Sequence, residues 1–244
     1  MTRLLAVNPN TSRGVTEACV AALQQFAPAG VTVEGVTGQF GARIVTTEAE
    51  NAIAAHAALD LVAAHREGYD GIILAISFDT GLLAISEVVD VPVAGITEGA
   101  LRAAEAAGGA IGVVVFGAVS LPLYRRLIAG YGVAAHGYEV IDLDLGRVYR
   151  GSGPGSGDAD AEVSAACARL AAAGAEAIVI CGAAIAGIAG RVQPGLAVPL
   201  FDGTAGLQLC LNRIAAGDTG PARPVAAGAT VGLSAELSAL IAPP

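Results

Sequence analysis

The stretch "GYDGIILAISFDTGLLAISEVVDVPVAGITEGALRAAEAAGG", residues 68–109, decides the fold because its plan returns later in the chain. Residues 174–217 read "GAEAIVICGAAIAGIAGRVQPGLAVPLFDGTAGLQLCLNRIAAG". Each stretch passes from a glycine and an acidic residue into an apolar strand, a short helix and a Val-Pro strand, and then through an acid-containing turn into an Ala-rich helix. This repeat predicts two similar lobes.

Working outward from the repeat, the whole chain alternates apolar runs with helical segments. The apolar runs are continuous, which is typical of parallel strands covered by helices on both faces. The sequence therefore predicts an α/β protein with parallel sheets. We expect strands near residues 3–7, 31–36, 71–76, 91–95, 111–116, 138–141, 177–181 and 198–201, and helices near residues 13–26, 47–67, 97–107, 121–131, 159–173 and 204–216.

The composition excludes several classes of protein. The 244 residues are 54% hydrophobic and 14% charged, which is enough for one large core or two smaller ones. The net charge is -9, and no arginine cluster exists beyond Arg125 and Arg126, so we expect no nucleic-acid partner and no membrane partner. The chain contains no lysine, which excludes a Schiff-base lysine and the lysine of a P-loop.

The longest uncharged stretch, residues 106–124, approaches the length of a membrane span. It contains four glycines and Pro122, so it is better interpreted as a buried strand, a turn and the start of a helix. The amino terminus becomes polar at Asn8, before the apolar core of a signal peptide is complete. We therefore expect a cytoplasmic protein.

Metal and dinucleotide sites are not expected. The three histidines show no metal-ligand spacing, and none of the four cysteines belongs to a CxxC pair. The segment "GSGPGSGD", residues 151–158, superficially resembles a dinucleotide fingerprint, but it contains Pro154 and follows a polar stretch rather than a strand. We interpret it as a flexible loop, and a lid over a cleft is one role open to it.

Polar residues follow several predicted strands. In open parallel sheets a ligand binds beyond the carboxyl ends of the strands, so a cleft between two lobes would collect these turns. The first turn offers side chains and free backbone N–H groups to a carboxylate or ureide oxygen, and helix capping explains only one of its four polar residues: Asn8, Asn10, Thr11 and Ser12. Asp79 with Thr80, and Thr97 with Glu98, either cap the helices that follow them or contact the ligand.

Four of these segments together resemble the aspartate/glutamate/hydantoin racemase superfamily, especially its hydantoin and allantoin racemase branch. They are "AVNPNTS" at 6–12, "DTGL" at 79–82, "VPVAGITEGA" at 91–100 and "AIVICGAAIAG" at 177–187. The resemblance implies two pseudosymmetric flavodoxin-like lobes, a small-molecule substrate between them, no cofactor and a homo-oligomer. We place the first lobe at residues 1–97, completed by about 205–244, and the second at residues 98–204.

The resemblance also implies two cysteines that move a proton on opposite faces of a carbon next to a carbonyl, and this sequence departs from that pattern. An ungapped match of the family's Cys-Phe-Xaa-Asp motif to "AISFDTGL" puts Ile76 at the first cysteine position, and a one-residue gap puts Ser77 there. In the second lobe, Gly182 matches the cysteine of Gly-Cys-Ala-Gly-Met, and Cys181 stands one residue earlier. The family's Thr-rich turn is replaced by the apolar Val115 and Phe116.

These departures make a two-thiol racemase unexpected. A thiol has a pKa of about 8.5 that falls at a helix amino terminus, whereas a serine hydroxyl is far less acidic. We therefore predict that Cys181 exchanges the proton and that Ser77 donates a hydrogen bond to a developing oxyanion. A small, core-facing role for Cys181 is the alternative. The predicted substrate-binding residues are Asn8, Asn10, Thr11, Ser12, Asp79, Thr80, Thr97, Glu98 and Gly182.

The predicted function is a cofactor-independent isomerase or racemase that acts at an acidic C–H next to a carbonyl. Its substrate would be a small ureide, a hydantoin or an α-substituted carboxylic acid. Two alternatives stay open. One is a lyase or decarboxylase in which Cys181 protonates the carbanion left by carbon dioxide. The other is a degenerate protein that binds a small molecule without turnover.

Overall fold

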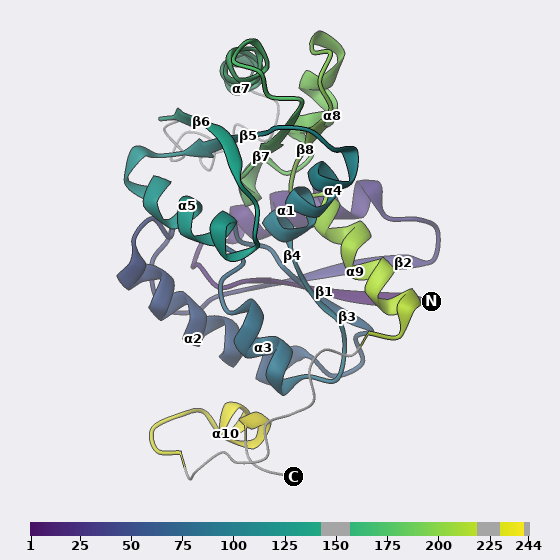
Figure 1. Ribbon diagram of the computed structural model, residues 1–244. Helices are drawn as coiled ribbons and strands as arrows, with labels where there is room; N and C mark the ends of the chain where they lie inside the picture. Colours follow the sequence, from purple (N-terminus) through teal and green to yellow (C-terminus); the bar gives the residue numbers. More distant parts are fainter. Residues whose placement is uncertain (143–156, 219–229, 242–244) are drawn as a thin grey trace.

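The computed structural model describes residues 1–142, 157–218 and 230–241, and these residues contain two parallel four-stranded sheets (Figure 1). The first sheet has the order β2-β1-β3-β4 and consists of β1 (Thr2–Asn8), β2 (Val31–Thr37), β3 (Gly71–Leu74) and β4 (Val93–Gly95). The second has the order β6-β5-β7-β8 and consists of β5 (Ile111–Phe116), β6 (Ala135–Ile141), β7 (Ala177–Ile180) and β8 (Leu200–Phe201). The two orders correspond strand for strand. This confirms the prediction of two pseudosymmetric α/β lobes.

Helices connect successive strands, as parallel pairing requires. The α-helices are α1 (Arg13–Phe26), α2 (Glu48–His65), α3 (Leu82–Val88), α4 (Ile96–Ala107), α5 (Leu121–Gly130), α7 (Gly157–Ala172), α8 (Ile188–Val192), α9 (Ala205–Ala216) and α10 (Ala235–Ile241). The described residues also include three short 3₁₀ helices: η1 (Ala118–Ser120), η2 (Ala183–Ile185) and η3 (Gln193–Gly195). The sequence did not predict α10, which packs against α2 through Leu237 and Leu240.

The third strand of each sheet ends earlier than predicted. The prediction extended these strands to residues 76 and 181, whereas β3 ends at Leu74 and β7 ends at Ile180. One more interstrand hydrogen bond follows each strand: the N–H of Ala75 donates to Val7 and that of Cys181 donates to Val114. The chain then leaves the sheet, so the residues that follow belong to turns at the edge of the sheet.

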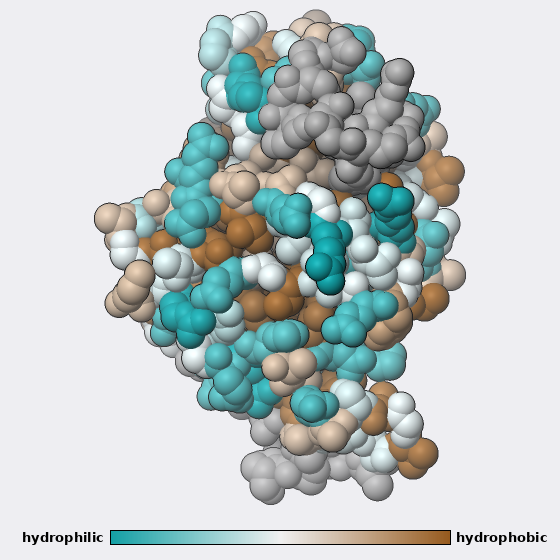
Figure 2. All heavy atoms as spheres, turned by 180° about the vertical axis from the view of Figure 1, so that it is seen from behind, coloured by the Kyte–Doolittle hydropathy of each residue, from teal (hydrophilic) through white to brown (hydrophobic). Residues whose placement is uncertain are grey.

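The contact between the lobes is built largely around α4. This helix packs against α9, against β4 of the first sheet, and against β7 and β8 of the second. Helix α9 also packs against β3 and β4. Seen from behind, hydrophilic side chains cover much of the surface, and hydrophobic side chains are visible between them near the middle (Figure 2).

Some expectations stay predictions. The lobe boundaries, the homo-oligomer and the cytoplasmic location are among them. A loop was predicted at residues 151–158. Residues 151–156 lie outside the described residues, and α7 begins at Gly157. Within the described ranges, no helix combines the length and the hydropathy needed to cross a membrane.

Candidate active site

A cavity of about 100 Å³ lies at the carboxyl ends of β1, β3, β5 and β7, where the two lobes meet. The turns after these four strands supply most of its lining, and the irregular segment before α2, the end of β5 and single residues of α1 and α5 supply the rest. Parallel strands bring their carboxyl ends to one edge of each sheet, which explains why residues far apart in the sequence meet here. The lining residues are Asn10, Val15, Ile44, Val45, Thr46, Ile76, Ser77, Phe78, Phe116, Gly117, Ser120, Tyr124, Gly182, Ala183, Ala184 and Ile185.

The turn after β1 is a hydrogen-bond network that leaves one amide group for the cavity. Buried Asn8 donates from Nδ2 to Oδ1 of Asn10 at 2.9 Å and to Oγ1 of Thr16 at 3.0 Å. Oδ1 of Asn10 also accepts from the N–H of Ser12 at 2.9 Å. Every fully buried side-chain N or O atom among the described residues has a partner, yet Nδ2 of Asn10 bonds to none of them. This amide group is therefore open to the cavity as a donor.

Ser77 connects the two lobes at the cavity. Its Oγ accepts a 3.1 Å hydrogen bond from the N–H of Ala183 in η2, and its carbonyl accepts a 2.7 Å bond from Oγ1 of Thr97 in α4. Both bonds use Ser77 as an acceptor. The hydroxyl hydrogen of Ser77 therefore stays available to an oxygen atom of a ligand.

Gly182 lies opposite, in the turn after β7. Its φ of +130° is a conformation that residues with a side chain rarely adopt. A Cβ atom built on Gly182 would lie 2.8 Å from Cγ1 of Ile185 and 3.3 Å from a ring carbon of Phe116. The position that matches the family's second cysteine is thus shaped for glycine.

Cys181 does not belong to the lining of this cavity. The residue is 2% exposed, and its side chain packs in the apolar core with Val113, Val115 and Val179. Side chains two residues apart share a face of a strand, so Cys181 continues the core-facing side of Val179, whereas Gly182 lies in the turn beyond the strand and lines the cavity. Burial, and then the nearby Asp79 carboxylate, raise the pKa of the Cys181 thiol far above its usual range, although a hydrogen bond with the Thr97 side chain lowers it. The thiol is therefore protonated at neutral pH.

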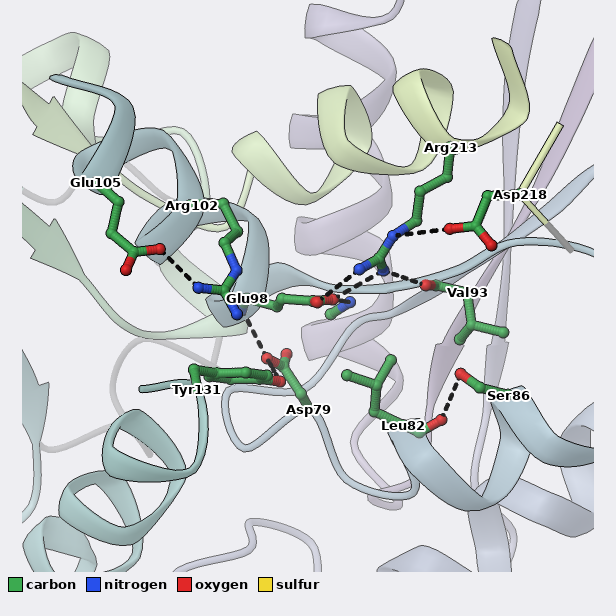
Figure 3. Close-up of polar contacts among 11 residues, drawn as sticks. Asp79, Leu82, Ser86, Val93, Glu98, Arg102, Glu105, Tyr131, Arg213 and Asp218 are labelled. Atoms are coloured by element: carbon green, nitrogen blue, oxygen red, sulfur yellow. Dashed lines mark hydrogen bonds and ion pairs between the residues drawn. The ribbon is translucent and has the colours of Figure 1, made fainter. Parts of the chain in front are cut away.

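Asp79 does not belong to the cavity lining either, and its carboxylate forms hydrogen bonds within the protein (Figure 3). Its Oδ1 accepts from the N–H of Thr97 at 3.1 Å, and its Oδ2 accepts from the N–H of Glu98 at 2.7 Å and from the hydroxyl of Tyr131 at 2.7 Å. Burial raises the pKa of the Asp79 carboxyl to about 7, although these hydrogen bonds act in the opposite direction. Asp79 and Thr97 therefore lie behind Ser77 rather than beside a ligand.

The other predicted binding residues hold the protein scaffold together. Glu98 forms a bidentate ion pair with Arg213 of α9, at 2.7 and 2.9 Å, as Figure 3 shows. The hydroxyl of Thr80 donates to Asn51 of α2 at 2.6 Å. The N–H of Thr11 donates to the carbonyl of Ala42, outside the cavity. Of the predicted set, the structure brings only Asn10, Ser77 and Gly182 together in the cavity lining, and Asn8 and Ser12 support Asn10 from behind.

Sequence reasoning missed Ser120, Tyr124 and the segment at residues 44–46. Ser120 is 2% exposed and lines the cavity, and its hydroxyl bonds to none of the described residues, so it is open to the cavity. Tyr124 packs its ring against Phe78, with centroids 4.6 Å apart. The rule that ligands bind after parallel strands points to Ser120, because it follows β5 by four residues.

The cavity presents an uncharged surface to a ligand. Its described lining contains amide, hydroxyl and apolar groups but no carboxylate, imidazole, thiol or guanidinium group. Such a lining suits a small neutral molecule whose carbonyl oxygens accept hydrogen bonds from Asn10 and Ser77. In the described part of the chain, no group of three or more His, Cys, Asp or Glu side chains is placed to hold a metal ion.

The fold and the cavity define a class of protein: two pseudosymmetric α/β lobes with a small-molecule site at the strand ends where they meet. Residues 4–207 match the Asp/Glu/Hydantoin racemase family, and the chain belongs to that family. The predicted superfamily is confirmed.

Individual relatives agree with this assignment. The chain is 30% identical over 152 residues to a hydantoin racemase of Rhizobium meliloti, a match that covers 62% of this chain and 63% of that protein. A hydantoin racemase of Paenarthrobacter aurescens is 31% identical over 102 residues, which cover 41% of this chain and 43% of that protein. Both matches span less than two thirds of the relative. The structure of an allantoin racemase from Klebsiella pneumoniae superposes with a TM-score of 0.88 and 30% identity, covering 98% of this chain and 99% of that one.

Proposed function

We propose that this protein is a cofactor-independent enzyme of the racemase type that acts on a small, uncharged ureide such as a hydantoin or allantoin. Membership of the racemase family and the likeness to an allantoin racemase over nearly the whole chain support the reaction class. The uncharged cavity lining supports a neutral substrate over an α-substituted carboxylic acid, because a buried carboxylate without a charged partner is costly.

The observation that carries this proposal is the pair of free donors, Nδ2 of Asn10 and the hydroxyl of Ser77, on one cavity. Removing the proton next to a carbonyl moves negative charge onto the carbonyl oxygen. Donors that are already in place for that oxygen stabilise the enolate and thereby acidify the C–H group. Asn10 and Ser77 are the groups to which we assign this role.

The described lining supplies no strong base, so the proton leaves to hydroxide from the solvent in this proposal. The enolate then takes up a proton from water on either face, which interconverts the two enantiomers. Because hydroxide is a reactant, the rate rises with pH. Cys181 receives no part in the reaction, since its protonated thiol lies in the core; the one-thiol lyase loses its proton donor for the same reason.

A second candidate function is binding without turnover. It is favoured by one observation: Ile76 and Gly182 line the cavity at the two positions that match the family's cysteines, and neither can carry a proton.

Proton exchange distinguishes these functions. The protein is incubated in deuterium oxide with single enantiomers of a 5-substituted hydantoin and of allantoin, and with an arylmalonate. The α-proton is followed by NMR and the optical activity by circular dichroism. Exchange with loss of optical activity supports the racemase. Binding without exchange above the protein-free rate supports the second candidate, and deuterium uptake only with loss of carbon dioxide from the malonate supports the lyase.

A matched pair of serine variants controls this experiment. Ser77→Ala removes the donor in the cavity, whereas Ser86→Ala removes a hydroxyl that bonds to the Leu82 carbonyl within α3. The proposal requires that Ser77→Ala slows exchange and that Ser86→Ala leaves it unchanged.

A further inference from the structure

The backbone at Asp79 is held in an unusual conformation. Asp79 is the one non-glycine residue with positive φ in the described part of the chain, at 46°. This conformation is sparsely populated by residues with a side chain, and it persists where the surroundings fix it. Here the carboxylate packs against Gly95 so closely that a Cβ atom at Gly95 would lie 2.1 Å from Cγ of Asp79. The turn after β3 is thus built around the Asp79 carboxylate.

Thr97 connects this carboxylate to the cavity. Its backbone N–H donates to Asp79 and its hydroxyl donates to the carbonyl of Ser77, so one residue of α4 holds both ends of residues 77–79. Ser77 and Phe78, which lie between these anchors, line the cavity. A change in the position of Asp79 is therefore expected to shift Ser77 and Phe78, which line the cavity.

Tyr131 connects the same carboxylate to the second lobe. It directly follows α5, the helix between β5 and β6, and its hydroxyl donates to Oδ2 of Asp79 at 2.7 Å. Asp79 belongs to the turn after β3 of the first sheet. Figure 3 shows the Tyr131 side chain reaching Asp79 beside the start of α4. The hydrogen bond thus joins the two lobes next to their shared cavity.

We infer that Asp79 is a positioning residue: its ionised carboxylate holds Ser77 and Phe78 at the cavity and ties them to Tyr131, so that ionisation of Asp79 strengthens ligand binding. The inference deepens the proposed function, on which it rests for the choice of ligand. A carboxylate accepts stronger hydrogen bonds than a neutral carboxyl group, so the ionised state holds the turn more firmly, while the cost of burying the charge lowers the stability of the whole fold.

Charged and titratable groups face Asp79 from each neighbouring element. Glu98 lies on α4 and is paired with Arg213 of α9, while Arg102 of α4 lies over the Tyr131 ring at 5.7 Å. Cys181 approaches from the end of β7 and is protonated. The pKa of Asp79, about 7, places its ionisation within the range in which proteins are commonly studied.

The inference is tested by the pH dependence of hydantoin binding, measured by calorimetry between about pH 5.5 and about pH 8.5. We expect the affinity of the wild type to rise about threefold or more across a midpoint near neutrality, as the loss of part of one hydrogen bond implies. Asp79→Asn should bind hydantoin weakly at high pH, and its affinity should show no step with pH. Any pH dependence that this variant retains comes from other groups, such as hydantoin itself. Tyr131→Phe should move the step to higher pH, because the hydroxyl that stabilises the carboxylate is lost.

Tyr69→Phe is the matched control. Tyr69 also donates its hydroxyl to a carboxylate, that of Glu34 at 3.1 Å, but on the surface of the first lobe. This variant should keep the affinity and the step of the wild type. Wild-type affinity that is independent of pH, or a step that survives in Asp79→Asn, overturns the inference.

A measurement without ligand separates this inference from the proposed function. Amide hydrogen exchange is followed in a peptide that spans residues 75–82, at about pH 8. We expect faster exchange in Asp79→Asn and in Tyr131→Phe than in the wild type and in Tyr69→Phe. If the wild type binds no hydantoin, the proposed function fails while faster exchange still supports the positioning role; equal exchange in all four proteins overturns that role.

Discussion

Ser77 and Ala183 meet across the two lobes: Oγ of Ser77 accepts a 3.1 Å hydrogen bond from the backbone N–H of Ala183. Ser77 follows β3 and Ala183 follows β7, which are equivalent strands of the two sheets. The equivalent strand ends therefore face one cavity. The contact uses the oxygen of Ser77 as an acceptor and leaves its hydrogen for a ligand.

The first prediction concerns this hydroxyl. Ser77→Ala should weaken hydantoin binding by about fivefold, the value of one net hydrogen bond, and should slow α-proton exchange by about a hundredfold, the value of one oxyanion donor. The variant should also lose stability, because the N–H of Ala183 is left without a partner. Calorimetry, exchange in deuterium oxide and thermal unfolding give the three values. Unchanged exchange would show that Ser77 meets no reacting oxygen.

The second prediction concerns the amide of Asn10. Asn10→Asp keeps an oxygen where Oδ1 accepts from Asn8 and Ser12, but it replaces the NH₂ donor with a second oxygen. We therefore expect a folded protein that binds hydantoin at least about tenfold more weakly, since a donor is lost and a negative charge faces a carbonyl oxygen. Calorimetry measures the affinity and circular dichroism the fold. Retained affinity would show that Nδ2 points away from the ligand.

Asn8→Ala gives the complementary result. Asn8 is buried and does not line the cavity, and the two hydrogens of its Nδ2 are shared among three acceptors: Oδ1 of Asn10, the carbonyl of Ser12 and Oγ1 of Thr16 in α1. Its loss should lower the melting temperature by more than that of Asn10→Asp, because three acceptors lose a partner.

The third prediction is a dependence of stability on pH that belongs to Asp79. Burial raises the pKa of this carboxyl from 3.8 to about 7 in the folded protein. Between these values the folded state binds more protons than the unfolded state, so the free energy of unfolding falls as the pH rises from about 4 to about 7. Above about 7 the carboxyl is ionised in both states, and this contribution stays constant.

Denaturant unfolding of the wild type and of Asp79→Asn at several pH values isolates that contribution. The difference between the two proteins should change by about 1 kcal/mol per pH unit at its steepest. Other carboxyls, such as those of Glu34 and Glu50, have a lowered pKa and act in the opposite direction, but they cancel in the difference. A difference that does not vary with pH would contradict a buried, protonated Asp79.

The repeat was enough to predict two similar lobes, because its two copies supply equivalent strands of the two sheets, β3 with β4 and β7 with β8. The bounds of α1 agree with the prediction, the rule about strand ends led to Asn10, and the match to the family's cysteine motifs led to Ser77 and Gly182. Such rules locate turns. They do not give the direction of a side chain within a turn.

Cys181 and Asp79 illustrate this limit. One residue decides whether a side chain after β7 faces the core or the cavity, and pattern alone does not fix the end of a strand to one residue. The positive φ of Asp79 turns its carboxylate toward α4, and a single residue without β-branching gives no signal of such a turn. Tertiary packing decided both positions.

The fourth prediction concerns Cys181. Cys181→Ser should leave hydantoin binding and proton exchange nearly unchanged, because the thiol lies in the core and does not belong to the cavity lining. It should cost about 1–2 kcal/mol of stability, since a more polar atom is buried in the same space. Exchange assays and unfolding measure both effects. A loss of exchange of a hundredfold would instead assign the proton transfer to Cys181.

The fifth prediction adds a thiol where the cavity has none. Ile76 lines the cavity and matches the family's first cysteine position, so Ile76→Cys places an ionisable thiol beside the ligand. A general base in contact with the substrate contributes about a hundredfold to ten-thousandfold. We expect exchange in Ile76→Cys to exceed that of the wild type and to follow the ionisation of the new thiol rather than hydroxide.

The second lobe does not accept a thiol at Gly182, the position that matches the family's second cysteine. Gly182→Cys therefore serves as the control for Ile76→Cys. Gly182→Cys forces a side chain onto a backbone at φ +130° and within 2.8 Å of Ile185, so it should unfold at lower temperature and gain little exchange. Gly182→Cys combined with Ile185→Ala removes the contact but keeps the strained backbone, and should recover only part of the stability. Faster exchange in Gly182→Cys than in Ile76→Cys would show that the second lobe, not the first, holds the reacting carbon.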